Sequence, residues 1–419
     1  MKISVVAVGT RGDVEPHMAL CCGLLKRGHQ VKLAAPMDFE RQASGLGLNF
    51  HPIGVSFRGL YDAKEGAALQ ACGHRSFALI KNLKKLASSI AGQVFSDIRG
   101  ACGGADAVCY SLLGMSAYYF AKEMGIPSAI TSLQPIGRTS SVFSPLVFSS
   151  LRLPRALNRM THVMVEQVFW QFFRPLMKAK SKTAVPFWGH FNELYRSGSP
   201  MLFAYSPSVV PRPDDYQRNM HVTGFWMLPP DNGWKPPAAL ADFISSGSPP
   251  VCVGFGSMNS KRIGKILDAA LRAILETGRR AIILKGWCKQ PLGTNDLGSD
   301  IFVIDDVPHS WLFPRVSAVV HHGGAGTTAA ALRAGVPSIV TPFFFDQWYW
   351  AQSLHRKGLG PEPISFDRAS PQSLKTALDV VERSVPLKQR LSVMSTQLQF
   401  EDGVSNAIAI LESAWDGKR

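Results

Sequence analysis

The sequence predicts an α/β protein with two domains, each built on a parallel β-sheet. Three observations support this fold class. The chain has 419 residues, which is too long for one ordinary hydrophobic core. In both halves, short apolar runs rich in β-branched residues alternate with helical stretches, as in doubly wound sheets. Between the halves, residues 206–237 contain seven prolines, which are excluded from the interior of regular elements and therefore indicate a linker.

The first half opens with a predicted strand at residues 2–8 and a helix at residues 14–27 that ends at Gly28. Further strands are predicted at residues 30–35, 105–110 and 126–130. Because the strands are parallel, the loops that follow them gather at one edge of the sheet. Open α/β sheets bind their ligands at that edge.

The second half repeats the alternation. Its predicted strands lie at residues 250–254, 281–285, 301–304, 318–320 and 337–343. A helix is predicted at residues 261–276, and the chain is helical from Ser370 onward, ending with an amphipathic run at residues 406–415. This half is therefore expected to form a second parallel sheet.

A glycine-rich turn joins the predicted strand 318–320 to the next helix, with the sequence His321-His322-Gly323-Gly324-Ala325-Gly326-Thr327-Thr328. Such a turn directs free backbone N–H groups and the positive end of the helix dipole at one place, and glycines let a phosphate come close. His322 and Thr327 add hydrogen-bond donors. The turn is a candidate cradle for a diphosphate, with tight packing as the alternative reason for its glycines.

Two polar residues follow the next predicted strand. Asp346 and Gln347 lie just past the carboxyl end of residues 337–343. A carboxylate and an amide at that edge can hold the hydroxyls of a sugar whose diphosphate lies on the glycine-rich turn.

These residues carry a resemblance to a known family. The run His322 to Thr327, followed by Pro342-Phe-Phe-Phe-Asp-Gln347, resembles the donor-binding signature of glycosyltransferase family 1. Within that family, residues 9–16 and 308–314 are similar to the branch of sterol glucosyltransferases and bacterial glycosyltransferases of lipids and natural products. The resemblance implies the GT-B fold, in which two Rossmann-like domains face each other across a cleft.

The resemblance also implies how the chain is divided. Residues 1–205 are expected to form an acceptor-binding domain, and residues 206–237 the proline-rich linker. Residues 238–395 are expected to bind the nucleotide-sugar donor. Residues 396–419 are expected to form a helix that packs back on the N-terminal domain.

On the acceptor side, the resemblance assigns Asp13 as the general base that takes the proton of the acceptor hydroxyl. The residues alone favour another interpretation, in which Asp13 caps the helix that starts at Val14. His17, one turn further along, is the second candidate for the base. Thr10 and Gln134 are the candidate acceptor-binding residues.

On the donor side, the resemblance implies contacts from Ser257 to phosphate and from the backbone near Val307 to the base. Trp311, close to Val307, is expected to lie in the core or near the base. Phe345 replaces the glycine usual before Asp346 in the sterol branch, which leaves the donor sugar open. The remaining donor-binding candidates are His322, Gly324, Ala325, Gly326, Thr327, Asp346 and Gln347.

Composition excludes several classes of protein. Hydrophobic residues make up 46% of the chain and charged residues 18%, which describes a globular protein rather than a disordered one. The seven cysteines show no C-x-x-C spacing, so a disulfide framework or a zinc site is not expected and a reducing cytoplasm fits best. No apolar span has bilayer length, and the first apolar run is too short for a signal peptide.

The net charge of +15 raises the question of which acidic partner the protein binds. Nucleic acid is not expected, because no recognised binding motif is present. Between Ile136 and Asn192 the only acidic residue is Glu166, while basic and aromatic residues are frequent. Such a mixture suits the interface of an anionic membrane. A slightly favoured alternative, which can coexist with it, is that the aromatic residues line the core or an acceptor pocket.

Together these observations predict an inverting, metal-independent glycosyltransferase. It is expected to transfer a sugar, glucose being the first candidate, from a UDP- or dTDP-linked donor. The expected acceptor is an apolar alcohol such as a sterol, carotenoid or polyketide. No cofactor is expected besides the nucleotide sugar as co-substrate. The alternatives are a nucleotide-sugar epimerase of the same architecture, a non-catalytic module that binds a sugar nucleotide or a lipid, and, on charge alone, a nucleic-acid binder.

Overall fold

The computed structural model describes residues 1–62, 90–140, 154–180, 185–188, 190–230, 233–256, 261–286, 298–343 and 346–416. The chain divides into two compact units. The first contains Met1–Leu60, the described residues from 90 to Leu228, and those from Glu401 onward, and the second includes Pro229–Phe400. The predicted α/β class with two Rossmann-like domains is confirmed.

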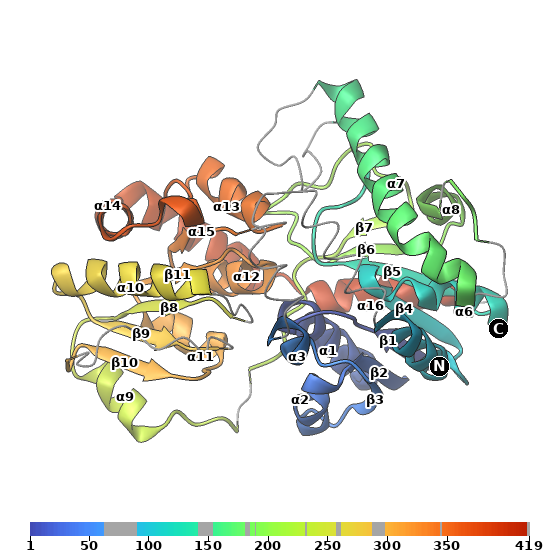
Figure 1. The fold of residues 1–419 in the computed structure, drawn as a ribbon, viewed down its shortest axis with the longest axis horizontal. Coiled ribbons are helices and arrows are strands. Elements are labelled where there is room, and N and C mark those ends of the chain that lie inside the picture. The colour runs from blue at the N-terminus through green and yellow to red at the C-terminus, as the bar shows by residue number, and fades with distance from the viewer. Residues whose placement is uncertain are drawn as a thin grey trace. The chain divides into compact units, whose positions relative to one another are not determined.

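The first unit contains a seven-stranded sheet in the order β3-β2-β1-β4-β5-β6-β7, with all neighbouring strands parallel (Figure 1). The strands are β1 Lys2–Val6, β2 Gln30–Pro36, β3 Asn49–Ile53, β4 Ala107–Ser111, β5 Ser128–Ser132, β6 Met201–Phe203 and β7 Met220–Val222. The central strands β4 and β5 are buried along their whole length, as expected for the middle of a parallel sheet.

The stretch 206–237, which was expected to be a linker, also supplies part of this sheet. The strand β7 lies within it and pairs with β6, and the first unit extends as far as Leu228. The strand β7 is only three residues long.

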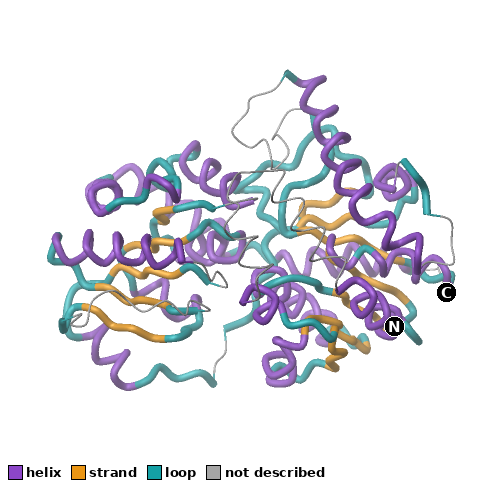
Figure 2. Tube along the Cα trace, in the orientation of Figure 1, coloured by secondary structure: helices purple, strands orange, loops and turns teal. Residues whose placement is uncertain are grey.

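Helices flank the strands of the first unit (Figure 2). They are α1 Arg11–Lys26, α2 Glu40–Gly45, α3 Phe57–Asp62, a helix over residues 90–102, α6 Ser116–Met124, α7 Arg155–Lys180, α8 His190–Arg196 and α16 Gly403–Trp415. The helices α1 and α16 share one apolar core with β1 and β2. In the described part of the chain, no helix is long and apolar enough to cross a bilayer.

The C-terminal helix packs on the first unit, as expected. Gly23 of α1 lets α16 come close, since a Cβ there would lie 2.5 Å from Val404 and 2.7 Å from Ile408. At the far end of the contact, Arg27 forms an ion pair of 2.7 Å with Glu412. The returning segment starts at Glu401 rather than at residue 396, because α15 of the second unit continues to Gln399.

The second unit contains a five-stranded parallel sheet in the order β10-β9-β8-β11-β12. The strands are β8 Val251–Gly254, β9 Ala281–Leu284, β10 Ile301–Ile304, β11 Ala318–His321 and β12 Ser338–Val340. The helices are α9 Ala238–Ser245, α10 Lys261–Glu276, α11 His309–Leu312, α12 Ala325–Ala334, α13 Asp346–Arg356, α14 Pro371–Arg383 and α15 Val385–Gln399.

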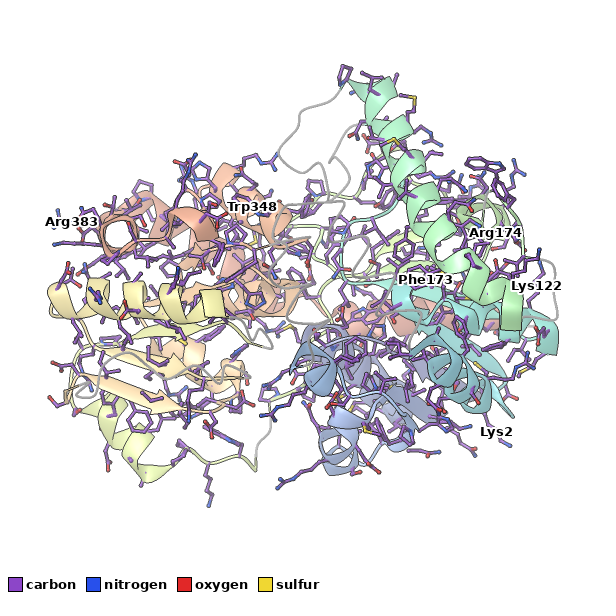
Figure 3. The ribbon with its side chains drawn as sticks, in the orientation of Figure 1. Lys2, Lys122, Phe173, Arg174, Trp348 and Arg383 are labelled. Carbon is purple, nitrogen blue, oxygen red and sulfur yellow. The ribbon has the colours of Figure 1, made fainter. Side chains whose placement is uncertain are left out.

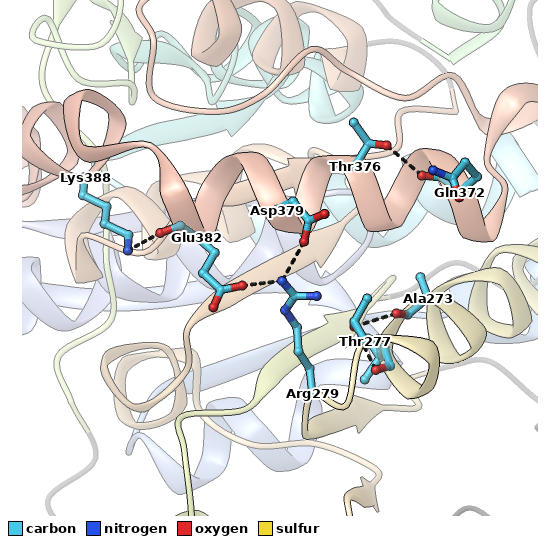
Figure 4. Close-up of polar contacts among 9 residues, drawn as sticks. Ala273, Thr277, Arg279, Gln372, Thr376, Asp379, Glu382 and Lys388 are labelled. Carbon is cyan, nitrogen blue, oxygen red and sulfur yellow. Dashed lines mark hydrogen bonds and ion pairs between the residues drawn. The ribbon is translucent and has the colours of Figure 1, made fainter.

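Polar contacts fix α14 beside α10 in the second unit. Arg279, in the turn after α10, donates to Asp379 at 2.8 Å and also contacts Glu382, both on α14 (Figure 4). Thr277 closes the end of α10 by donating to the carbonyl of Ala273 at 2.7 Å.

Each sheet has a point at which the strand order reverses. In the first unit the chain builds β1, β2 and β3 outward and then returns to place β4 on the other side of β1. In the second unit the same reversal occurs between β8 and β11. Ligands of open α/β sheets bind beyond the carboxyl ends of the strands at such a point. Both predicted site loops, after β1 and after β11, lie at these reversals.

Candidate active site

The first candidate group is Asp13, in the first turn of α1. Thr10 caps the helix and Asp13 occupies its third position. The backbone N–H of Thr10 donates to Oδ2 of Asp13 at 2.9 Å, and the Thr10 hydroxyl donates to the same oxygen at 3.2 Å. Asp13 therefore helps to start the helix as the partner of the capping residue, and not as the cap itself.

The other oxygen of this carboxyl group is unengaged. Oδ1 of Asp13 accepts no hydrogen bond from any described residue. Burial raises the pKa of the Asp13 carboxyl, while the two bonds from Thr10 oppose this shift. A carboxylate with one unengaged oxygen and a raised proton affinity has the properties of a general base.

Gly9 determines where this carboxylate lies. Its φ is +147°, and a Cβ at this position would lie 2.3 Å from Oδ2 of Asp13. Any side chain at residue 9 would therefore displace the carboxylate. This contact was not predicted from the sequence, although a glycine directly before the capping threonine is a visible signal of it.

His17 lies in the core of the first unit. Only 1% of its surface is exposed, and its ring meets the ring of Trp226 edge to face at 5.6 Å. Nδ1 lies 2.6 Å from the backbone carbonyl of Asp13, and Nε2 lies 2.7 Å from the hydroxyl of Thr131. Burial lowers the pKa of His17 to about 4, so the ring is neutral at pH 7.

The neutral His17 ring has a protein group at each nitrogen. Nδ1–H donates to the carbonyl of Asp13, and Nε2 lies against the Thr131 hydroxyl. That hydroxyl also lies 3.0 Å from the carbonyl of Tyr110, and its one proton can be donated to only one of the two. Both nitrogens then have protein partners, which leaves no lone pair directed at a ligand. Thr131 was not anticipated, because nothing in a sequence links residues 114 positions apart.

Gln134 follows β5 at the same sheet edge. The hydroxyl of Ser132 donates to the backbone carbonyl of Gln134 at 2.9 Å, and the N–H of Gln134 donates back to that hydroxyl at 3.2 Å. Thr131, which contacts His17, lies three residues before Gln134. The loop that carries Gln134 therefore starts beside the residues that position the first turn of α1.

The second candidate group surrounds the start of α12. Gly324 precedes the helix as its N-cap residue, and having no side chain it makes no side-chain capping bond to the first turn. The first N–H groups of a helix need partners from outside it, and here they are combined with the positive end of the helix dipole. Thr327 is partly exposed on this turn, whereas Thr328 is fully buried.

His322 lies across this helix start. A Cβ on Gly324 would come within 2.6 Å of Nε2 of His322, so the ring fits only because residue 324 is glycine. Nδ1 of His322 is buried without a hydrogen-bond partner among the described residues. A buried donor without a partner is costly, which favours the tautomer that carries its proton on Nε2. Burial, with His309 nearby, lowers the pKa of His322 to about 4.

Two neighbouring positions shape the loop. His321 is fully buried, and its Nδ1 accepts a 3.1 Å hydrogen bond from the N–H of Gly323. Gly323 has a φ of +88° and lies against the backbone of Gln347. Around Gly326, in contrast, a Cβ would meet no atom of a described residue within 4 Å. Open space beside the uncapped helix turn is what the approach of a phosphate requires.

Asp346 and Gln347 begin α13, close to this loop. Asp346 is the first residue of the helix and is partly exposed. Gln347 is buried, and its side-chain carbonyl accepts a 2.8 Å hydrogen bond from the N–H of Phe343. The amide oxygen of Gln347 thus holds the turn between β12 and α13, in addition to any contact with a sugar.

The remaining donor candidates have mixed outcomes. Val307 is fully buried after β10. Trp311 is half-buried, with the ring of Trp234 at 5.2 Å and the guanidinium of Arg315 at 4.6 Å, so it is not a core residue. Ser257 and Phe345 lie outside the described residues. Among the described residues, no group of three His, Cys, Asp or Glu side chains could hold a metal ion.

Two known domain families match parts of the chain. Residues 3–108 match the family described as the glycosyltransferase family 28 N-terminal domain, and residues 280–399 match the erythromycin biosynthesis protein CIII-like C-terminal domain. The first match carries the number 28, whereas the motifs resemble family 1, and these matches do not separate the two.

The chain is also similar to curated sterol 3-beta-glucosyltransferases. It is 31% identical over 417 residues to one from Arabidopsis thaliana, covering 97% of this chain and 67% of the relative. It is 30% identical over 427 residues to one from Gibberella zeae, covering 97% of this chain and 29% of the relative. The chain thus spans about two thirds of the plant protein and less than a third of the fungal one.

Solved structures share the fold. The glycosyltransferase of kitacinnamycin superposes with a TM-score of 0.72 at 19% identity, over 98% of both chains. The glycosyltransferase VinC, solved in complex with dTDP, superposes with a TM-score of 0.69 at 16% identity over 100% of both chains.

Proposed function

The chain belongs to the glycosyltransferase family that includes the sterol 3-beta-glucosyltransferases, and we propose on this premise that it transfers a sugar from a nucleotide sugar to the hydroxyl of an apolar alcohol such as a sterol. Glucose is the first candidate for the sugar. Binding of the nucleotide-sugar donor is supported by the uncapped start of α12. There His322 lies over Gly324, and space is open beside Gly326.

In the proposed reaction, Asp13 accepts the proton of the acceptor hydroxyl through Oδ1. The hydroxyl oxygen forms a bond to the anomeric carbon as the bond from that carbon to the diphosphate breaks, which inverts the configuration. Nε2–H of His322 and the first N–H groups of α12 stabilise the charge of the departing diphosphate. Because these groups compensate the negative charge, we expect no requirement for a divalent metal.

Asp346 and Gln347 are proposed to hold the sugar, with Val307 and Ser257 on the base and phosphate side. Thr10 and Gln134 are proposed to border the acceptor. We retain membership of glycosyltransferase family 1 as part of this proposal, because it rests on the motifs at residues 322–327 and 342–347.

The test is transfer from a panel of UDP- and dTDP-sugars to a pool of apolar alcohols, followed by mass, with Asp13→Asn beside the wild type. We expect one alcohol to gain the mass of a hexose or deoxyhexose, and the variant to lose this product while it still binds donor. If the variant transfers as well as the wild type, Asp13 is not the base. A changed sugar nucleotide formed without any alcohol would instead establish an epimerase.

We also propose that α7 touches an anionic membrane. One face of this helix carries five apolar side chains that are each 39–59% exposed: Leu157, Met160, Val163, Met164 and Val168. Arg155, Arg159 and Lys178 are also exposed on α7. A helix that lies on a membrane surface has this composition: its Lys and Arg side chains contact the lipid headgroups, and its apolar side chains enter the layer below them.

The aromatic residues near α7 divide between the core and the surface. Trp170 is fully buried and donates to the carbonyl of Pro186 at 3.0 Å, whereas Trp188 is 66% exposed. Arg174 also donates to Pro186 at 3.0 Å and lies over the ring of the exposed Phe187, next to Phe173 in the helix (Figure 3). The core interpretation is therefore correct for Trp170, while Phe187 and Trp188 extend the exposed surface.

Flotation with vesicles tests this contact. The wild type should float with vesicles that contain phosphatidylserine and remain in solution with phosphatidylcholine alone. Met160→Glu should abolish flotation, because it places a charge where an apolar side chain would enter the membrane. Val393→Glu, at a similarly exposed position on α15, is the matched control and should float as the wild type does. Equal flotation of both variants would contradict the proposal.

A further inference from the structure

Two carboxylates from distant parts of the chain hold the loop that follows β5, one through an ion pair and the other through hydrogen bonds. Each such set of contacts is called a fastening below. This loop, residues 133–140, starts at the sheet edge beside Thr131 and carries Gln134. Its close packing is visible at Gly137, where a Cβ would lie 2.7 Å from the hydroxyl of Tyr216. The two fastenings lie beyond that glycine, at Arg138 and at Thr139.

The first fastening is a buried ion pair between Arg138 of the loop and Glu166 of α7. Nε of Arg138 donates to Oε2 of Glu166 at 2.5 Å, and Nη1 donates to Asn192 at 2.5 Å. The side chains of Arg138 and Glu166 are only 14% and 9% exposed. Glu166 is the only acidic residue between Ile136 and Asn192.

Tyr195 of α8 completes this fastening. Its hydroxyl accepts a 3.1 Å hydrogen bond from the backbone N–H of Arg138 and donates to Oε1 of Glu166 at 2.8 Å. The Arg138 guanidinium also lies over the Tyr195 ring at 4.6 Å. Both oxygens of Glu166 are thus engaged. A buried, fully paired carboxylate of this kind permits one geometry of its partners.

The second fastening holds the next two residues of the loop. The hydroxyl of Thr139 donates to Oδ1 of Asp215 at 2.8 Å, and the N–H of Ser140 donates to Oδ2 at 2.7 Å. Asn158 of α7 donates to the carbonyl of Thr139 at 3.0 Å. The far end of the loop is therefore fixed to α7 and to the segment before β7.

We propose that Glu166 is a positioning residue for the acceptor. It fixes the loop that carries Gln134, and so sets the place of the acceptor hydroxyl relative to Asp13. This inference rests on the proposed transferase function. Glu166 itself touches no substrate; it acts through Arg138 and Tyr195. Transfer requires the reacting atoms to be aligned closely, so a loosened loop reduces the productive binding of the acceptor.

The test is Glu166→Gln, with the acceptor KM, the kcat and the donor Kd measured separately. We expect the acceptor KM to rise about tenfold and the donor Kd to stay unchanged. Glu123→Gln is the matched control, because Glu123 forms a 2.7 Å ion pair with Arg99 and its side chain is 10% exposed, in the same unit but away from this loop. The control should keep the wild-type acceptor KM.

A double variant, Arg138→Met with Glu166→Leu, separates positioning from stability. Replacing both partners removes the unpaired charge and is expected to recover stability. If Glu166 positions the acceptor, the acceptor KM stays raised. Recovery of the KM together with stability, or an unchanged KM in Glu166→Gln, would overturn the inference. If the wild type itself transfers to no alcohol, the proposed function has failed instead.

Discussion

At the scale of single residues, the contact between Gly9 and Asp13 offers a test of the base that leaves the base in place. A methyl group at residue 9 would overlap Oδ2 of Asp13, so Gly9→Ala must rotate the carboxylate away or shift the start of α1. A displacement of about 1 Å costs roughly 100-fold in rate when alignment is critical. We expect Gly9→Ala to lose transfer activity to that extent while the donor Kd, measured by calorimetry, is unchanged.

The control is Gly45→Ala, in α2 of the same unit. A Cβ at Gly45 would meet no atom of a described residue within 4 Å, and the φ of Gly45 lies outside the positive range. This variant should retain wild-type activity. Full activity in Gly9→Ala would show that the precise place of Oδ2 does not matter and would weaken the assignment of Asp13.

His17 makes the stability of the protein depend on pH. Its pKa is lowered from 6.5 to about 4 by burial, so the unfolded chain binds a proton between these values while the folded chain does not. The stabilisation is fully present above pH 6.5 and is lost as the pH falls towards 4. Its size is on the order of 3 kcal/mol.

This dependence is measured by denaturant unfolding at a series of pH values. His17→Gln cannot bind a proton, so its free energy of unfolding should fall less than that of the wild type between pH 6.5 and 4. The two curves should therefore approach each other at low pH. Parallel curves would mean that His17 is not held neutral in the core.

At the scale of elements, α12 allows a test that separates stability from ligand binding. Gly326 lies in the first turn of this helix with open space around it. Replacing a helical glycine with alanine stabilises a helix by up to about 1 kcal/mol. The added methyl group would, however, occupy the space through which a diphosphate approaches. We therefore expect Gly326→Ala to melt at a higher temperature and to bind UDP about tenfold more weakly.

Gly92→Ala is the control for helix stability. Gly92 also has no atom within 4 Å of a Cβ and lies in the helix over residues 90–102 of the other unit. It should raise the melting temperature without any effect on UDP binding. Unchanged UDP affinity in Gly326→Ala would place the diphosphate elsewhere.

At the scale of the whole molecule, the sequence predicts most strands of the two sheets. The strands over 301–304 and 30–35 were located almost to the residue because apolar residues dominate both, although β10 is only partly buried. The strands β6 and β7, which have three residues each, were not predicted.

The places of the candidate site residues in the fold could be predicted from the sequence, but their contacts could not. The positions of Asp13 and His322 follow from strand-to-helix turns, which the sequence shows locally. The partners of His17 and the buried pair of Arg138 with Glu166 arise from segments that meet only in the folded chain. A single sequence records which residues are polar, but it does not record which of them face each other.

Because the chain divides into two units, we expect a substitution in the core of one unit to leave ligand binding by the other unit intact. Trp415 is 2% exposed and packs α16 into the core of the first unit, although it lies near the end of the chain. Trp415→Ala should cost about 3–5 kcal/mol there, while UDP still protects a separate transition of the second unit against heat. Leu391→Ala, buried on α15 of the second unit, should lower the UDP-protected transition instead. If both variants lowered one common transition equally, the two units would unfold as a single cooperative body.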